Sequence, residues 1–194
     1  MIKKEFLDAK EKALKSLEQA CYKNKTDKKI IPILHIINNI ESCYTTSSCA
    51  GRTVLLEIPK IGDKKGAKFL GKWHRIIKTS DIKKAAEKAE KGLIWILAQS
   101  PVFHIGCTDI NIADKLLKTA TASGFKHSGL KSSRRKIIVE VCSTERLDAP
   151  VGRDRNLFCN EEYLQLLIDI SNEINEVSKT KISQFEVNLR QNFV

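Results

Sequence analysis

The stretch LIWILAQSPVFHIGC, from Leu93 to Cys107, joins two strand signals in direct succession. Its first six residues form a continuous apolar run, which is typical of a buried strand. Pro101 interrupts the run, and VFHIGC then predicts a second strand. The two strands decide the fold class because a helical pattern precedes the first and another follows the second.

Both helical patterns carry start and stop signals. Ser80 and Asp81 can cap the first helix, which runs to about Lys91, while Thr108 or Asp109 caps the second, which ends at Ser123-Gly124. Strands are also predicted ahead of the first helix and behind the second. The order strand, helix, strand therefore occurs twice, over Phe69–Ile77 through Ala98 and over Val102–Leu130, which indicates a duplicated unit.

Helices are predicted at both ends of the chain. Glu5–Cys21 has one apolar face, and a short helix follows around Pro32. A long helix over 160–194 carries an apolar stripe of Tyr163, Leu167, Ile170, Ile174 and Val177, and the segment Thr144–Asn160 before it is expected to be irregular. We predict an α+β fold that is not Rossmann-like: a single domain of 194 residues with a mixed or antiparallel curved sheet and an N-terminal helical arm over 1–30.

Several classes of protein are disfavoured. Glycine-rich nucleotide fingerprints, phosphate loops and zinc-protease motifs are missing from the sequence. The six cysteines lack metal-site spacing, so we expect no metal site and mostly small buried thiols. No apolar run approaches the roughly 20 residues of a membrane helix. The amphipathic N-terminus is not a signal peptide, and we expect a cytoplasmic protein.

Positive charge is the strongest compositional signal. The formal net charge is +11, and it is unevenly spread. Lys60–Lys84 holds nine basic residues, Lys126–Lys136 holds five, and Glu161–Glu176 holds five acids with no base. A polarised basic chain favours nucleic acid as its partner, although solvated lysines without a partner remain an alternative.

The segment YTTSSCAGR, from Tyr44 to Arg52, predicts a turn rich in hydroxyls ahead of the strand Thr53–Ile58. It is either a plain hairpin tip or the wall of a pocket. The guanidinium of Arg52 binds carboxylates and phosphates at two points, and neighbouring serines can orient the same anion. Cys49 has no marked base beside it and is expected to be a packed wall residue.

Two histidines are further candidates. By strand alternation, His104 shares a face with Gly106, which leaves room for a close approach. His74 follows Trp73 in the basic segment, where aromatic and cationic groups together suit RNA bases. A lone histidine in a strand and a tryptophan anchoring a strand are the structural alternatives.

The segments TTSSCAGR, VFHIGC, SGF…SGL, the pair Ser143-Thr144 and NEEYLQLLIDISNE occur in an order that resembles the wybutosine-synthesising protein 3 family. The resemblance covers about Pro32 to Gln184. It implies an S-adenosylmethionine-dependent methyltransferase that acts on N4 of the tricyclic base at position 37 of phenylalanine transfer RNA. One departure is that IIKTS closes the Trp73 strand, where the family has a Ser/Thr-His pair.

The resemblance and the patterns together give a set of candidate residues. The predicted catalytic residues are His104, as the proton acceptor, and Arg52. The predicted cofactor-binding residues are Ser47, Ser48, Cys49, Gly51, Ser128, Gly129, Ser143 and Thr144. The predicted contacts to the anticodon stem-loop are Lys72, Trp73, His74, Arg75, Lys131, Arg134, Arg135 and Lys136. The rival hypotheses are a non-catalytic RNA-binding module and a small-molecule enzyme whose charge is incidental. The oligomeric state is left open.

Overall fold

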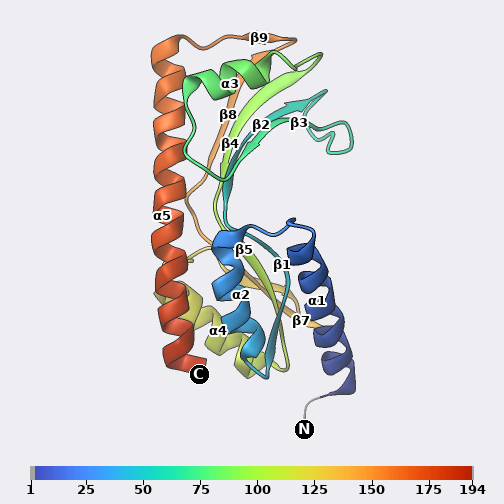
Figure 1. Ribbon diagram of the computed structural model, residues 1–194. Coiled ribbons are helices and arrows are strands. Elements are labelled where there is room, and N and C mark those ends of the chain that lie inside the picture. Colours follow the sequence, from blue (N-terminus) through green and yellow to red (C-terminus); the bar gives the residue numbers. More distant parts are fainter. Residues whose placement is uncertain (1–2, 194) are drawn as a thin grey trace. The chain divides into compact units, whose positions relative to one another are not determined.

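A computed structural model describes residues 3–193 and contains five α-helices and nine strands (Figure 1). The helices are α1 Lys4–Tyr22, α2 Ile31–Asn39, α3 Thr79–Ala86, α4 Ile110–Ala122 and α5 Glu161–Phe193, and a 3₁₀ turn η1 covers Lys28–Ile30. The strands are β1 Cys43–Cys49, β2 Arg52–Ile58, β3 Lys68–Trp73, β4 Leu93–Gln99, β5 Val102–Cys107, β6 Gly129–Ser132, β7 Ile137–Cys142, β8 Leu147–Arg153 and β9 Asn156–Leu157. The α+β class is confirmed.

The strands form two antiparallel sheets instead of one. Sheet A has the order β1-β5-β7-β6, and sheet B has the order β3-β2-β4-β8-β9. Each sheet holds one predicted strand–helix–strand unit: β3 and β4 flank β2 in sheet B, while β5 and β6 flank β7 in sheet A. Every pair of neighbouring strands in the described residues is antiparallel, so neither sheet is a Rossmann-type parallel sheet.

The chain divides into two compact units. The first comprises the described chain up to Ala50, Pro101–Thr144 and the part from Lys179 on; the second comprises Gly51–Ser100 and Glu145–Ser178. Each unit has its own apolar core and its own sheet. The expected single domain stays a prediction.

The core of the first unit lies between sheet A and the helices α2, α4 and α5. Phe103, Phe125 and Phe185 meet there at ring-centroid distances of 5.4 to 6.2 Å. Phe103, Ile105 and Cys107 are buried on one face of β5, as alternation predicts. The opposite face of the same strand therefore carries His104 and Gly106.

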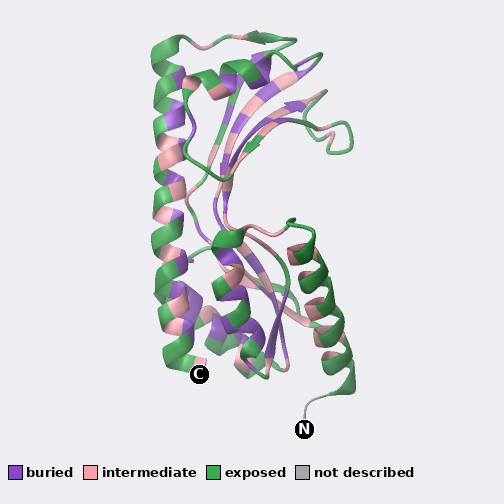
Figure 2. Ribbon diagram, in the orientation of Figure 1, coloured by how far each residue is buried: buried purple, intermediate pink, exposed green. Residues whose placement is uncertain are grey.

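The core of the second unit lies between sheet B and the helices α3 and α5. Leu55, Ile94 and Ile96 pack there against α3 residues such as Ile82 and α5 residues such as Leu167. Strand β4 alternates between buried and half-buried residues along its whole length (Figure 2). Only alternate residues of sheet B thus enter this core.

Two predicted strand boundaries are wrong for identifiable reasons. Strand β3 ends at Trp73, not Ile77, because the side chain of Asn172 takes both backbone groups of Ile77 at 2.9 and 3.0 Å. Strand β6 begins at Gly129, not Phe125, because the amide of Phe125 closes the end of α4 by bonding to Ala120.

Three further expectations need correction. The segment expected to be irregular contains β8 and β9; Pro150 is tolerated in β8 because the register shifts at its partner Trp95. Helix α3 ends at Ala86, and Asp81 caps it by accepting from the amide of Lys78. On α5, Tyr163 is 48% exposed, while the buried stripe includes Ser171 and Ser178, whose hydroxyls bond to carbonyls four residues earlier.

Residue 106 must be a glycine because the ring of Tyr44, on the neighbouring strand of sheet A, lies directly over it. A Cβ atom there would lie 2.5 Å from the ring of Tyr44, which in turn packs edge-on against Phe6 at 5.1 Å. The room expected beside His104 is therefore filled by a tyrosine of the same protein.

We predict that Gly106→Ala destabilises the fold by about 1–3 kcal/mol, because the added methyl overpacks the Tyr44 ring. Gly129→Ala is the matched control, since nothing lies within 4 Å of a Cβ at that position. Urea unfolding of both variants measures the difference. Equal stability of the two variants would contradict the close packing of Tyr44.

Candidate functional site

The hydroxyl-rich segment 44–52 is a strand and a crossing, not a turn. Ser47, Ser48 and Cys49 belong to β1, and Arg52 opens β2, which lies in the other sheet. Gly51 joins the two strands at a φ of 87°, a conformation that favours glycine. The sequence of this segment does not predict a strand, because its residues are mostly polar. Polar side chains are tolerated here because β1 lies at the edge of its sheet, in contact with water.

Three side chains form a hydrogen-bonded row across the middle of sheet A. His104 on β5 lies opposite Ser47 on β1 and opposite Glu140 on β7. The Ser47 hydroxyl is 2.8 Å from Nδ1 of His104, and Nε2 of His104 is 2.6 Å from the Glu140 carboxylate. The structure thus brings together Ser47 and His104, two of the predicted site residues.

Glu140 was missed by sequence reasoning. It lies in IIVEVC as the single acid of an apolar strand, on the alternate face from Val139 and Val141, and that placement was a usable signal. Lys131 also contacts its carboxylate, at 3.1 Å. Partial burial acts to raise the pKa of Glu140, but the hydrogen bonds from His104 and Lys131 outweigh it and the pKa is lowered. Glu140 is therefore ionised near neutral pH.

A carboxylate on one imidazole nitrogen selects the tautomer of the ring. An ionised Glu140 only accepts hydrogen bonds, so Nε2 of His104 must carry a proton. In a neutral ring Nδ1 is then the acceptor, and the Ser47 hydroxyl donates to it. The arrangement leaves the oxygen of exposed Ser47 as the outermost group of the row.

A cavity of about 260 Å³ lies along the edge of β1 in the first unit. Hydroxyl side chains line it, and Lys25 and Asp27 contribute charges of both signs; the hydroxyl residues are Ser16, Thr26, Thr45, Thr46, Ser47 and Ser48. The Ser48 hydroxyl is buried and has no hydrogen-bond partner among the described residues. An unsatisfied buried hydroxyl in a polar cavity suits a polar ligand.

The remaining cofactor candidates of the first unit lie on and beside β6 and β7. The Ser128 hydroxyl donates to the Phe125 carbonyl at 2.7 Å and accepts from the Cys142 amide at 3.1 Å, so it already holds the backbone in place. Gly129 lies opposite Glu140. Ser143 is buried, whereas Thr144 is exposed.

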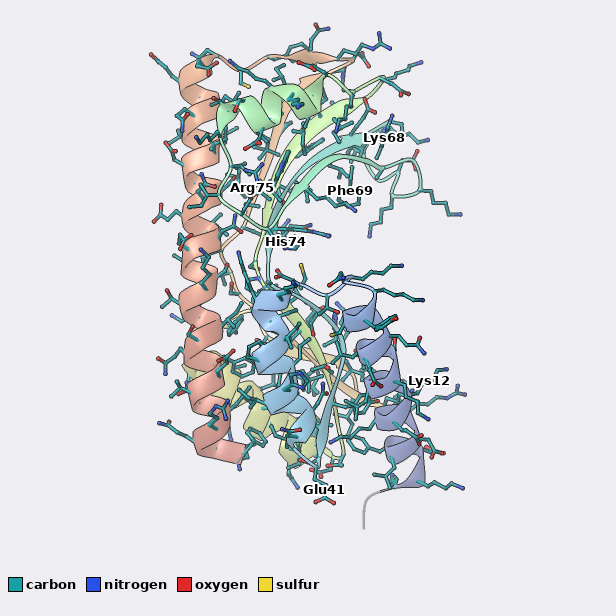
Figure 3. The ribbon with its side chains drawn as sticks, in the orientation of Figure 1. Lys12, Glu41, Lys68, Phe69, His74 and Arg75 are labelled. Carbon is teal, nitrogen blue, oxygen red and sulfur yellow. The ribbon has the colours of Figure 1, made fainter. Side chains whose placement is uncertain are left out.

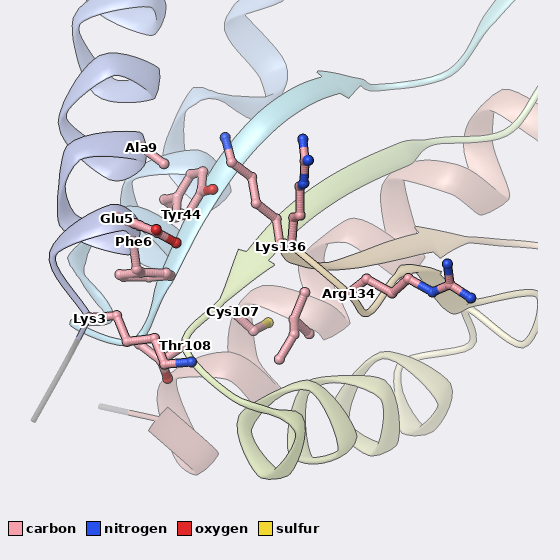
Figure 4. A pocket seen from close by; sticks show the side chains of 11 residues that line it. Lys3, Glu5, Phe6, Ala9, Tyr44, Cys107, Thr108, Arg134 and Lys136 are labelled. Atoms are coloured by element: carbon pink, nitrogen blue, oxygen red, sulfur yellow. The ribbon is translucent and has the colours of Figure 1, made fainter.

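The basic turn between β6 and β7 borders a second, smaller cavity of about 100 Å³ (Figure 4). Phe6 and Ala9 of α1 and Tyr44 of β1 form its apolar wall. The exposed cations at its rim are Lys3, Arg134, Arg135 and Lys136. Exposed cations of this kind can contact phosphates, and the predicted contact of this turn with RNA stays a prediction.

The second unit contains Gly51, Arg52 and the residues predicted to bind RNA around Trp73. Nε of Arg52 donates to Gln99 at 2.9 Å, and its guanidinium lies 5.5 Å from the ring centroid of Phe69. Among the described residues, the two terminal nitrogens of Arg52 have no hydrogen-bond partner. They can therefore meet an anion.

The four predicted RNA contacts of this unit differ in availability. Lys72 is exposed and lies 3.9 Å above the Phe69 ring. Trp73 packs over Gly71 and against the core. His74 binds the Gly51 carbonyl through Nδ1 at 2.9 Å, and Arg75 forms a two-point ion pair with Asp81 (Figure 3). Lys72 thus has the most accessible charge of the four.

Comparison with known proteins assigns this chain to a family. Residues 8–191 match the family model described as Methyltransferase TYW3. The chain belongs to this family. The resemblance to the wybutosine-synthesising protein 3 family is therefore confirmed, and family membership implies a methyl donor.

Named relatives of this methyltransferase family match over almost their whole length. A protein of Pyrococcus horikoshii is 43% identical over 182 residues, 93% of each chain, and is named tRNA(Phe) 7-((3-amino-3-carboxypropyl)-4-demethylwyosine(37)-N(4))-methyltransferase 1. A Methanocaldococcus jannaschii protein with the same name, lacking the final number, is 41% identical over 169 residues, 86% of this chain and 88% of its own.

Solved structures agree with the fold. The PH1069 protein from Pyrococcus horikoshii has a TM-score of 0.90 at 42% identity and covers 95% of each chain. A hypothetical protein from Aeropyrum pernix has a TM-score of 0.74 at 24% identity, covering 85% of this chain and 98% of its own, and so supports the fold alone. Within residues 3–193, no helix is both long enough and apolar enough to cross a membrane.

We predict that Glu140→Gln lowers the free energy of unfolding at neutral pH by about 1 kcal/mol, because a partly exposed charged hydrogen bond contributes this order. In the folded protein, the pKa of the Glu140 carboxyl lies below its ordinary value of 4.5. The stabilising contribution of Glu140 is therefore present above pH 4.5 and is lost as the pH falls through this lowered pKa.

Urea unfolding from pH 7 down to pH 3 measures this loss. Glu18→Gln, which removes an exposed carboxylate from α1, is the control and should change little at any pH. A Glu140→Gln deficit that stays constant across the range would contradict the ionised carboxylate.

Proposed function

We propose that this protein transfers a methyl group from S-adenosylmethionine to ring nitrogen N4 of the tricyclic base at position 37 of phenylalanine transfer RNA, a step of wybutosine biosynthesis. The observation that carries the proposal is the match over 93% of both chains to a relative named for this reaction. The cytoplasm as location is part of the same proposal.

The polar cavity at the edge of β1 fits one end of S-adenosylmethionine. The methionine portion of that cofactor is a zwitterion, and Lys25 and Asp27 supply the complementary charges. The buried hydroxyl of Ser48 lacks a partner and can donate to the carboxylate. When bound, the cofactor supplies an electrophilic methyl group on its sulfonium.

The Ser47–His104–Glu140 row can remove the proton that the target nitrogen loses. The Ser47 oxygen accepts the proton from the ring nitrogen while its own proton passes to Nδ1 of His104. The imidazolium that results lies 2.6 Å from the Glu140 carboxylate, which stabilises the new charge. His104 is thus the proposed base, and Ser47 relays the proton to it.

The row differs from a hydrolase triad. In the Ser-His-Asp arrangement, the carboxylate binds Nδ1 and the serine binds Nε2, whereas here the two nitrogens are exchanged. A group of residues that only accepts a proton does not need the serine on Nε2 and the carboxylate on Nδ1. This difference favours proton removal over acyl transfer.

RNA recognition is proposed to rest on the exposed cations of both units. Arg134, Arg135 and Lys136 in the first unit and Lys72 in the second can contact phosphates of the anticodon stem-loop. Position 37 lies in a single-stranded loop, so its base can enter a pocket without opening a long duplex. A non-catalytic RNA-binding module would need no methyl donor, and the methyltransferase family match disfavours it.

We predict that calorimetry detects S-adenosylmethionine binding and that Ser48→Ala weakens it about tenfold, the order of one hydrogen bond to a charged group. Ser183→Ala, an exposed hydroxyl of the same unit on α5, should bind as the wild type does. Titrations are run with and without phenylalanine transfer RNA that carries the demethylated tricyclic base. RNA binding without any cofactor binding would favour the non-catalytic module.

A further inference from the structure

One face of sheet B carries an exposed aromatic side chain that no part of the proposed chemistry uses. Phe69 on the edge strand β3 is 44% exposed (Figure 3). The second core takes in Leu70 beside it but not Phe69. A single exposed ring is common on a protein surface, so what matters is whether Phe69 belongs to a larger apolar patch.

Phe69 heads a cross-strand row over four strands. Leu56 on β2 lies opposite Phe69 on one side and opposite Trp95 on the other, and Trp95 lies opposite Pro150 on β8. Leu56 and Trp95 are half-buried, and Pro150 is exposed. We call these four residues the platform. It is an apolar strip on the sheet face opposite to the second core.

Two cations border the platform. The ammonium of Lys72 lies 3.9 Å from the Phe69 ring centroid, and the guanidinium of Arg52 lies 5.5 Å from it. Neither cation forms an ion pair with a described carboxylate, in contrast to Arg75, which is paired with Asp81. Aromatic carbon and unpaired positive charge are thus concentrated at one spot.

Positive charge continues along the edge of β3. A depression of about 480 Å³ runs from Phe69 and Lys72 to α3, where exposed Lys84 and Lys88 line it. One carboxylate, that of Asp81, lines the same depression and is held by Arg75. The edge therefore offers a basic track beside the aromatic ring.

We propose that the platform binds an unpaired nucleotide of the RNA substrate by stacking its base on Phe69, with Lys72 and Arg52 on the neighbouring phosphates. Aromatic side chains beside a basic groove bind single-stranded RNA in this way because every base has a π-face. Lys72 exchanges its contact with the ring for a contact with phosphate. A second copy of this chain would bring the same cations to the surface and is disfavoured by charge repulsion.

The inference rests on the proposed function for the identity of the partner and adds the surface that holds it. Trp73, the tryptophan expected from the sequence to stack on RNA, packs over Gly71 and against the second core but also lines the same depression, so its contact with RNA stays a prediction. The inference adds Phe69, four residues earlier on the same strand, as a stacking side chain.

Fluorescence anisotropy with a labelled anticodon stem-loop of phenylalanine transfer RNA tests the platform. We expect Phe69→Ala to weaken binding by about 5- to 100-fold, the range of one lost base stack, and Phe69→Tyr to restore most of it. Phe158→Ala removes a ring that is 75% exposed in the same unit and should leave binding unchanged. A plot of the logarithm of the RNA-binding constant against the logarithm of the salt concentration has a slope that reflects the number of phosphates contacted. Lys72→Gln should reduce the magnitude of this slope by about 0.7, the value for one phosphate of a single strand.

The outcomes separate this inference from the proposed function. Weakened RNA binding by Phe69→Ala, with unchanged calorimetric affinity for S-adenosylmethionine and an unchanged melting temperature, supports the platform. Wild-type RNA affinity in Phe69→Ala overturns the platform while leaving the methyltransferase proposal intact. A shift of Phe69→Ala to a smaller oligomer, with RNA affinity kept, overturns it in favour of a self-interface.

Discussion

The 2.6 Å hydrogen bond between His104 and Glu140 constrains the chemistry of the first unit. Because Glu140 is ionised, it fixes the proton of the imidazole on Nε2 and leaves Nδ1 to face Ser47. The antiparallel register of β1, β5 and β7 places the three residues directly opposite one another, so the row needs no loop to assemble it. Sites built on strands are held more rigidly than sites on loops, and proton transfer depends on such fixed distances.

Each sheet has one face in an apolar core, and the candidate functional residues lie on the other face. In sheet A, Phe103, Ile105 and Cys107 are buried, and His104 lies on the alternate face. In sheet B, Leu55 and Ile96 are buried, and the platform of Phe69, Leu56, Trp95 and Pro150 lies on the alternate face. The two-residue period of a strand thus places the candidate residues and the apolar core on opposite faces of each sheet.

Much of the fold could be predicted because it depends on local sequence patterns, namely apolar runs, helix caps and amphipathic periodicity. The apolar runs of β4 and β5, the Asp109 cap of α4 and the amphipathic α1 all lie where the sequence predicts them. Strand β8 was missed because Pro150 and Gly152 read as loop residues, and β1 was missed because its hydroxyls do not alternate. The pairing of His104 with Ser47 and Glu140 could not be predicted, since strand register is a long-range property. Phe69 went unnoticed because exposure on an edge strand has no local signature.

The central claim is that His104 takes the proton that the target nitrogen loses. Single-turnover methyl transfer to phenylalanine transfer RNA bearing the demethylated tricyclic base measures this most directly, with wild type and His104→Ala at saturating cofactor and RNA. The account predicts a rate lower by about 10²- to 10⁴-fold in His104→Ala, with both binding affinities kept. An unchanged rate in that variant would contradict the account, because another group would then have to accept the proton.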